Sequence, residues 1–245
     1  MNSNRKSGLV SSVSKITIGG IAIGITVVIL ALTILDGFER VVSDKINEFN
    51  AQIKVTGFGN RNLPASEFVA KKIAENFGKD ISSVDPFSSK LAIIKSKKVT
   101  DGITLTGVST QFASNSFNKF LVAGNIFSSE PTNKEILIGK NLAQKMGIRK
   151  GDRITMFCLK GNAPPSLENP PAIEQFIVIG IFETGISEYD DGNAFINLKN
   201  SQELFGMYDE VSGFNISISD NSKLAVISSK LQDYLGYPFY VRTIY

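Results

Sequence analysis

The sequence contains no histidine and no tryptophan, and it has a single cysteine, Cys158. Without histidine, Ser-His-Asp and Cys-His catalysis are impossible, and the commonest metal ligand is missing. One cysteine cannot form an internal disulfide, and the apolar, strand-like surroundings of Cys158 indicate a small buried residue rather than a nucleophile. These absences argue against an enzyme in its own right, and we expect no metal and no cofactor.

Motifs for nucleotide and hydrolase chemistry are also missing. The chain has no GxxxxGK[ST] phosphate loop, no GxSxG turn and no HExxH motif. Its net charge of +3 comes from acidic and basic residues that are mixed throughout, which gives no electrostatic footprint for nucleic acid. An acidic group over 183–193 could offer oxygen ligands to Ca²⁺, but it lacks the regular spacing of a calcium loop. We therefore expect a solvated, irregular loop there; its acids are Glu183, Glu188, Asp190 and Asp191.

One long apolar run organises the chain. Ile16–Leu35 contains no charged residue, and about 20 residues at ~1.5 Å each span the roughly 30 Å of a bilayer core. We assign a transmembrane helix to residues 13–35. A cleaved signal peptide is the alternative, but its apolar core would be shorter, and no A-x-A-like site precedes Asp36.

Charge sets the expected orientation of this helix. Three basic residues precede it and acidic residues follow it; the basic ones are Arg5, Lys6 and Lys15. Because positive charge stays in the cytoplasm, residues 1–12 should form a mobile cytoplasmic tail. Residues after 36 should lie in the periplasm of a bacterium, outside the inner membrane.

Two features of the helical region suggest contacts. Gly20 and Gly24 form a GxxxG pattern, which favours close helix packing but also reflects the glycine content of membrane helices. Residues 36–50 keep a helical period and predict a stalk. Its apolar residues could contact lipid acyl chains or another subunit, or pack within the domain; they are Phe38, Val42, Ile46 and Phe49.

The remaining chain predicts an α+β domain. Residues 51–96 and 213–245 each follow a β-α-β pattern, and two split βαβ units make a ferredoxin-like sheet with helices on one face. A mostly β insertion separates them. We assign residues 51–102 and 206–245 to one discontinuous subdomain and 103–205 to the inserted one. Asp85-Pro86 should break or bend the first unit's second strand, and Asp101-Gly102 should lie in a hairpin connection.

Two proline pairs mark a loop in the insertion. Lys160–Ala172 separates two expected strands, 153–159 and 174–182. Prolines favour extended, protruding backbone, so this is either a plain surface loop or an arm that a partner grips. The prolines are Pro164, Pro165, Pro170 and Pro171.

Several segments together resemble a known family. The apolar span followed by Asp36–Glu39 is similar to permease subunits of the MacB/FtsX-type ABC transporter superfamily. Ile138–Asp152 is similar to the GxxLAxxLGvkxGD segment of its lipoprotein-releasing LolC/LolE branch, Gly180–Asp190 to that branch's GxFxTGxxEYD segment, and Tyr240–Thr243 to the strand before the next membrane span.

The resemblance implies a Porter subdomain of βαβ units with an inserted Sabre subdomain. It also implies a permease that pairs with an ABC ATPase subunit and with a second permease, the same or related. Such permeases release lipoproteins from the inner membrane to a LolA-like periplasmic carrier, which a proline-containing Hook arm holds; Lys160–Ala172 matches that arm. Family members carry three further spans, so we interpret the chain as a fragment. The alternatives are an FtsX-like regulator of a cell-wall enzyme and a MacB-like efflux permease.

Overall fold

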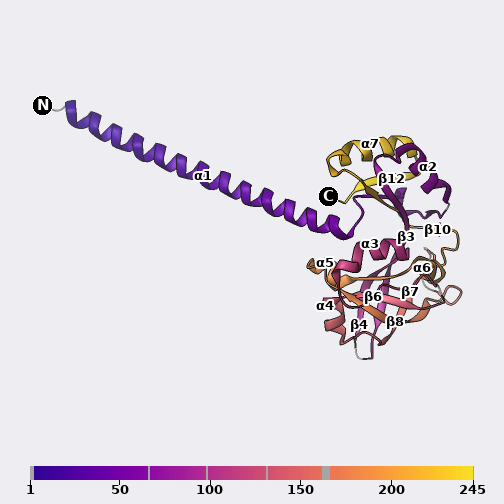
Figure 1. Ribbon diagram of the computed structural model, residues 1–245. Coiled ribbons are helices and arrows are strands. Elements are labelled where there is room, and N and C mark those ends of the chain that lie inside the picture. Colours follow the sequence, from indigo (N-terminus) through magenta and orange to yellow (C-terminus); the bar gives the residue numbers. More distant parts are fainter. Residues whose placement is uncertain (1–2, 66, 98, 131, 162–165, 245) are drawn as a thin grey trace. The chain divides into compact units, whose positions relative to one another are not determined.

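The computed structural model describes residues 3–65, 67–97, 99–130, 132–161 and 166–244. The chain divides into two compact units, Met1–Ile46 and Asn47–Tyr245. Helix α1 (Ser3–Phe49) supplies the first unit, and its last residues belong to the second. Figure 1 labels the elements of both units.

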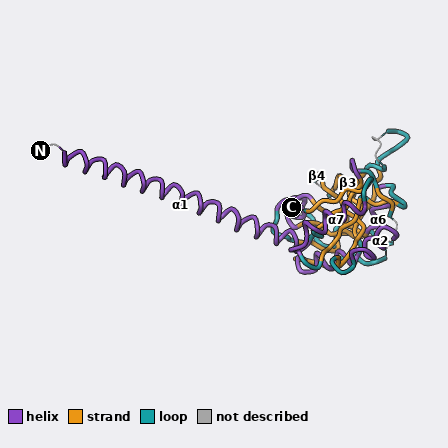
Figure 2. Tube along the Cα trace, turned by 90° about the horizontal axis from the view of Figure 1, so that it is seen from above, coloured by secondary structure: helices purple, strands orange, loops and turns teal. Residues whose placement is uncertain are grey.

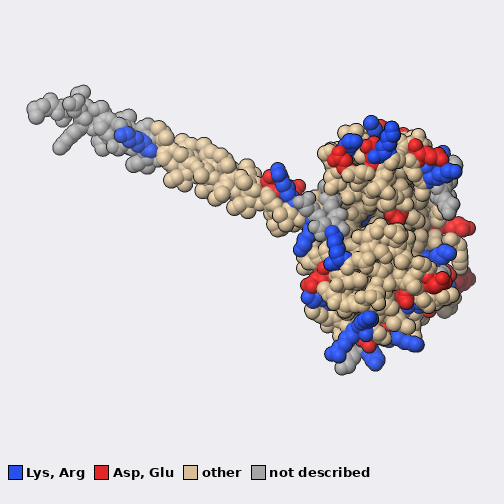
Figure 3. Space-filling view, viewed as in Figure 1, with Lys and Arg blue, Asp and Glu red and all other residues tan. Residues whose placement is uncertain are grey.

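Helix α1 is longer than the sequence predicts. It begins at Ser3, so residues 3–12 of the expected tail are helical: once a helix is nucleated, each further residue adds one hydrogen bond at little cost. Within it, Thr17–Ser43 is long and apolar enough to cross a membrane. Figure 3 shows no charged atoms along the middle of this helix. The Thr26 and Thr33 hydroxyls donate 2.8 Å hydrogen bonds to carbonyls four residues earlier, which satisfies polar groups in an apolar stretch.

The first part of the second unit is a sheet covered by two helices, here called the open sheet. Its strand order is β12-β1-β11-β3, and every neighbouring pair is antiparallel. Strands β1 and β3 are therefore parallel to each other with β11 between them, as are β11 and β12 with β1 between them, and both β-α-β predictions are confirmed. The elements are β1 (Ile53–Gly57), α2 (Glu67–Phe77), β3 (Ile81–Lys95), β11 (Gly213–Ile218), α7 (Leu224–Leu235) and β12 (Phe239–Thr243).

One face of the open sheet packs on the helices. Ile53 and Val55 of β1 are buried there with Ile73 of α2 and Leu231 of α7. Figure 1 shows α2 and α7 together on this side. Because successive strand residues point to opposite faces, Lys54 lies on the face without helices.

Strand β3 runs on where a break is expected. Pro86 lies within it and is paired in register with Phe214 of β11. The ladder between β3 and β4 starts only at Phe87, so the missing proline N–H costs no ladder bond on that edge. Asp101-Gly102 likewise lies inside β4 (Thr100–Val108) rather than in the hairpin connection.

The second part of this unit is a closed ring of strands, here called the barrel. Pairing runs β3–β4–β9–β6–β8–β7 and returns to β3. Strand β5 pairs with β8 outside the ring. Besides β3 and β4, the strands are β5 (Leu121–Gly124), β6 (Glu135–Gly139), β7 (Arg153–Cys158), β8 (Ala172–Phe182) and β9 (Asn193–Asn197).

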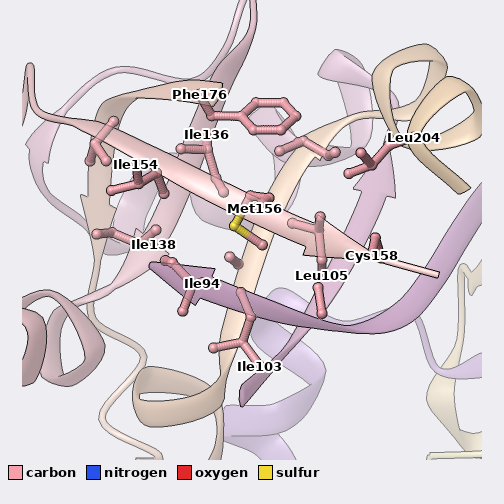
Figure 4. Packing of buried hydrophobic residues seen from close by; sticks show 14 of the residues in the cluster. Ile94, Ile103, Leu105, Ile136, Ile138, Ile154, Met156, Cys158, Phe176 and Leu204 are labelled. Atoms are coloured by element: carbon pink, nitrogen blue, oxygen red, sulfur yellow. The ribbon is translucent and has the colours of Figure 1, made fainter. Parts of the chain in front are cut away.

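An apolar core fills the barrel. Figure 4 shows side chains from facing strands, among them Ile94, Leu105, Met156 and Phe176, pointing toward one another. Cys158 is buried in this core, as the sequence predicts, and burial raises the pKa of its thiol to about 11.

Short helices cover the barrel. They include α4 (Lys140–Met146) and α6 (Leu198–Phe205), each ended by a left-handed glycine, Gly147 and Gly206. The sequence analysis missed α3 (Thr110–Phe117) and α5 (Ser187–Gly192). The smaller elements are η1 (Phe58–Asn60), β2 (Leu63–Pro64), η2 (Asn118–Phe120), β10 (Glu210–Val211) and η3 (Asn221–Lys223).

Candidate partner-binding surface

The proline-containing loop joins two neighbouring strands of the barrel. The last pair between β7 and β8 is Cys158 with Ala172, so the loop over 159–171 begins and ends on adjacent strands. Figure 2 shows the described part of this loop projecting beyond the strands. Pro170 and Pro171 are exposed, whereas Pro164 and Pro165 lie outside the described residues.

The described ends of this loop are held by hydrogen bonds. The Gly161 amide donates to the carbonyl of Phe205 at 2.9 Å. The Lys90 ammonium donates to the carbonyls of Leu159, at 3.4 Å, and Gly161, at 2.5 Å. Burial lowers the pKa of Lys90. These contacts fix the root of the loop against β3 and α6, and Leu167 near its tip is fully exposed.

An apolar row lies on the outer face of the barrel beside this loop. Ile93 pairs with Phe157, and Phe157 pairs with Ile173, so the three side chains form a line across β3, β7 and β8. Leu91, at 81% exposure, and Ile173, at 62%, are as open as surface residues. Leu91 borders a groove of about 520 Å³ with almost no polar lining, together with Ile93, Phe157, Leu159 and Pro171. Such a patch marks an interaction surface.

The sequence analysis missed this apolar row. A usable signal is the stretch 91–94, which is apolar at every position, so that both faces of the strand are apolar. A ring of strands has only one interior, and the other face of such a strand therefore needs a partner.

Two of the segments that carry the family resemblance, 138–152 and 180–190, meet in the structure. Strands β6 and β8 pair in parallel, with Gly139 beside Phe182. The next residues form an ion pair, with 2.8 Å between Lys140 Nζ and Glu183. A Cβ at Gly139 would lie 2.2 Å from the carbonyl oxygen of Asp190, so only glycine fits.

Asp190 holds the second segment together. Its carboxylate, 2% exposed, accepts hydrogen bonds from the amides of Thr184, at 2.8 Å, and Gly185, at 2.9 Å. The Thr184 hydroxyl donates a third, at 2.9 Å. The expected solvated loop over 183–193 is therefore wrong: part of it is α5, and its central acid is buried because backbone donors replace water.

The same acids do not assemble a metal site. Asp190 is occupied by backbone donors, and Glu183 pairs with Lys140. Among the described residues, no group of three or more potential ligands converges.

Tyr189 connects this segment to the end of α1. Its ring packs edge-on against Phe49 with 4.7 Å between centroids, and its hydroxyl accepts from the Asn50 amide at 2.9 Å. Burial raises the pKa of Tyr189. Phe49 also meets Phe120 and is only 1% exposed. The structure therefore excludes Phe49 as a surface contact for lipid or a subunit: it packs within the domain.

The other predicted residues of α1 stay predictions. Phe38 is exposed within the first unit, and Val42 and Ile46 follow it on the same helix face. At Gly20 and Gly24, no atom lies within 4 Å of where a Cβ would stand, so a second helix could approach there.

Comparisons with known proteins identify the class. Two solved structures share the fold: the periplasmic region of MacB from Actinobacillus actinomycetemcomitans (TM-score 0.53, 14% identity, 81% of this chain and 91% of that one), and the extracellular domain of the ABC-type transporter YknZ from Gram-positive bacteria (TM-score 0.51, 13% identity, 78% and 99%). The model of the MacB-like periplasmic core domain matches residues 14–234. The chain therefore belongs to the family of MacB-like periplasmic core domains.

Within this family, the chain is similar to lipoprotein-releasing system transmembrane proteins. It is 26% identical to LolC of Xylella fastidiosa over 98% of this chain and 57% of that protein. It is 22% identical to LolC of Neisseria meningitidis, over 94% and 55%, and 23% identical to LolE of Haemophilus influenzae, over 88% and 52%. The chain thus spans little more than half the length of these relatives.

Proposed function

We propose that this chain is the first membrane span and periplasmic region of an ABC transporter permease that releases lipoproteins from the bacterial inner membrane. A separate ATPase subunit supplies the energy, and a second permease, the same or related, completes the membrane part. The similarity to LolC and LolE supports this proposal, as does the apolar α1. We place the membrane boundary near residue 36 and the rest in the periplasm.

The observation that carries the proposal is the exposed apolar row beside the 159–171 loop. We propose that a LolA-like periplasmic carrier docks here, with the loop and its prolines as the gripping arm. In this assignment the split βαβ subdomain, 51–102 and 206–245, is the Porter and 103–205 is the Sabre. Burying the large exposed side chains, about 1.5–3 kcal/mol each if complete, would give the row a substantial share of the affinity.

Carrier binding tests this directly. The full chain in detergent micelles is incubated with purified LolA-like carrier, and Kd is measured by interferometry. Replacing Ile173 by Ser should weaken binding at least tenfold, and so should a Gly-Ser turn in place of residues 162–169. Ile177→Ser is the matched control, because Ile177 is exposed on the same strand but lies outside the row.

The outcomes separate the alternatives. Equal binding by all variants would remove the docking surface while leaving the family unchanged. No carrier binding, with capture of a cell-wall hydrolase or its activator, would favour an FtsX-like regulator. Capture of an outer-membrane channel complex would favour MacB-like efflux, which the likeness to the periplasmic region of MacB keeps open.

A further inference from the structure

A second pocket lies where the open sheet meets the barrel. It shares Leu91, Gly102 and Ile103 with the groove beside the 159–171 loop, and its other lining residues lie outside that groove. Its volume is about 450 Å³, within the range of small-molecule sites. Its lining combines aromatic and apolar side chains with several hydrogen-bonding groups. We call it the basic pocket. Its principal residues are Lys54, Phe87, Val108, Phe112, Phe195 and Asn215.

Lys54 gives the pocket a cation that lacks a counter-ion. Its ammonium lies 4.8 Å from the centre of the Phe87 ring, and no carboxylate in the described part of the chain pairs with it. The ring reaches this place because Gly213 has no side chain: a Cβ there would lie 3.0 Å from the ring edge. Burial, and then the charge of Arg242 on the neighbouring strand, lower the pKa of Lys54 to about 8. A buried cation beside another cation is costly unless an anion joins it.

Asn215 stands directly across from Lys54. The two residues pair in register between β1 and β11, so their side chains leave the same face as neighbours. Asn215 is 6% exposed, yet among the described residues its side-chain amide has no hydrogen-bond partner. Buried amides are nearly always hydrogen-bonded. A bound oxyanion would satisfy both this amide and the Lys54 ammonium.

The nearby acids do not act as the counter-ion of Lys54 or as the hydrogen-bond partner of Asn215. Asp85 pairs with Asn215 on the other side, but its carboxylate accepts from the Ser109 hydroxyl at 3.4 Å. Glu188 lines the pocket from α5, and it forms no ion pair with Lys54 in the described part of the chain.

We propose that the basic pocket binds a small organic anion: one oxyanion, carboxylate or phosphate, attached to a flat apolar body. The oxyanion accepts hydrogen bonds from the Lys54 ammonium and the Asn215 side-chain amide. The apolar body lies against the aromatic lining of the barrel side, which includes Phe112 and Phe195. This site is independent of the proposed lipoprotein release.

Saturable binding of model anions tests the proposal. The probes are phenylacetate and phenyl phosphate, with phenylacetamide as the neutral counterpart of the same shape. Binding to the full chain in nanodiscs is followed by saturation-transfer NMR, with empty nanodiscs as the blank. At least one anion should bind with a millimolar or tighter Kd, and phenylacetamide at least tenfold more weakly. The two anions tell a carboxylate site from a phosphate site.

Variants assign the binding to the pocket. Lys54→Met should weaken the anion at least tenfold, Asn215→Ala severalfold, and Lys54→Arg should keep the affinity within about threefold of the native chain. Lys119→Met is the matched control, since Lys119 also lies over a ring, at 5.2 Å from the centre of Phe120, but outside the pocket. Lys54→Met should fold, because it removes a buried charge. Asn215→Ala tests the same pocket independently, through the anion affinity. Equal binding of phenylacetate and phenylacetamide, unchanged affinity in Lys54→Met, or no saturable binding of either anion would overturn the proposal.

Discussion

The open sheet and the barrel bury their apolar residues in different ways. The sheet has one covered face, under α2 and α7, and its other face carries polar groups such as Lys54 and Asn215. The barrel closes on itself and keeps its core inside, so its outer face is free to carry other side chains. There it presents the Ile93–Phe157–Ile173 row. In each part, the face that the core does not need carries the candidate binding site.

The largest expected effect breaks the barrel core. Phe176→Ala removes a ring that is buried inside the barrel, and a cavity of this kind costs about 3–5 kcal/mol. Thermal unfolding of the full chain in micelles, followed by far-UV circular dichroism, should show a clearly lower Tm. Ile177→Ala, next to it but facing outward, should change Tm little; an equal loss in both variants would contradict the assignment of inside and outside.

The next largest effect concerns Lys54 on the open face of the sheet, which makes the stability of the domain depend on pH. Because the folded pKa of Lys54 is lowered to about 8, the unfolded chain binds more protons between pH 8 and its usual 10.5. Burying the charged Lys54 therefore lowers the free energy of unfolding by its full amount below pH 8. This loss is recovered as the pH rises from 8 to 10.5, by about 3 kcal/mol in total. Cys158 and Tyr189 act oppositely because their pKa values are raised.

The difference between native chain and Lys54→Met isolates this residue. The stability difference, from urea titrations at several pH values, should favour Lys54→Met below pH 8 and shrink toward pH 10.5. A difference that stays constant with pH would show that Lys54 is not buried as a cation.

Asp190 tests the segment that joins the end of α1 to the barrel. Asp190→Ala leaves the amides of Thr184 and Gly185 without their acceptor, which costs about 2 kcal/mol. Protease sites over 183–193 should be cut faster in this variant. Asp191→Ala is the control, since Asp191 is exposed, and should cleave like the native chain.

The smallest effect concerns the Lys140–Glu183 pair. Both side chains are more than a third exposed, so Lys140→Met should cost at most about 1 kcal/mol, and less at high salt. A double-mutant cycle with Glu183→Gln measures the coupling. Coupling well above this value would mean that the pair does more than lie on the surface of the barrel.

The sequence predicted the elements whose pattern is local. The alternation at Ile53 and Val55 and the helix face of Leu224, Ile227 and Leu231 need no knowledge of the rest of the chain. The order of the open sheet followed from repeating that unit. The apolar length of α1 was equally plain, although not its start.

What the sequence could not give depends on distant contacts. A proline breaks a strand or not according to which edge is paired, and Pro86 lies where one edge has no ladder. From the sequence alone, Asp190 is predicted to be a solvated acid, because the sequence does not show that the amides of Thr184 and Gly185 donate to its carboxylate. The outward row needs the register of three strands, which single-strand patterns do not contain.

Strand β3 belongs to both parts, with residues 81–87 paired to β11 and 87–95 paired to β4. Those of its backbone amides that donate to a neighbouring strand therefore exchange with solvent through openings that disturb one core or the other. A hydrogen-exchange profile along β3 would report the stability of the open sheet and the stability of the barrel on a single peptide. If a docked carrier stabilises the barrel, protection from exchange should rise from Ser88 onward, while the residues before Pro86 keep their exchange rates. Exchange along this one strand would therefore show how far the effect of a binding event extends through the domain.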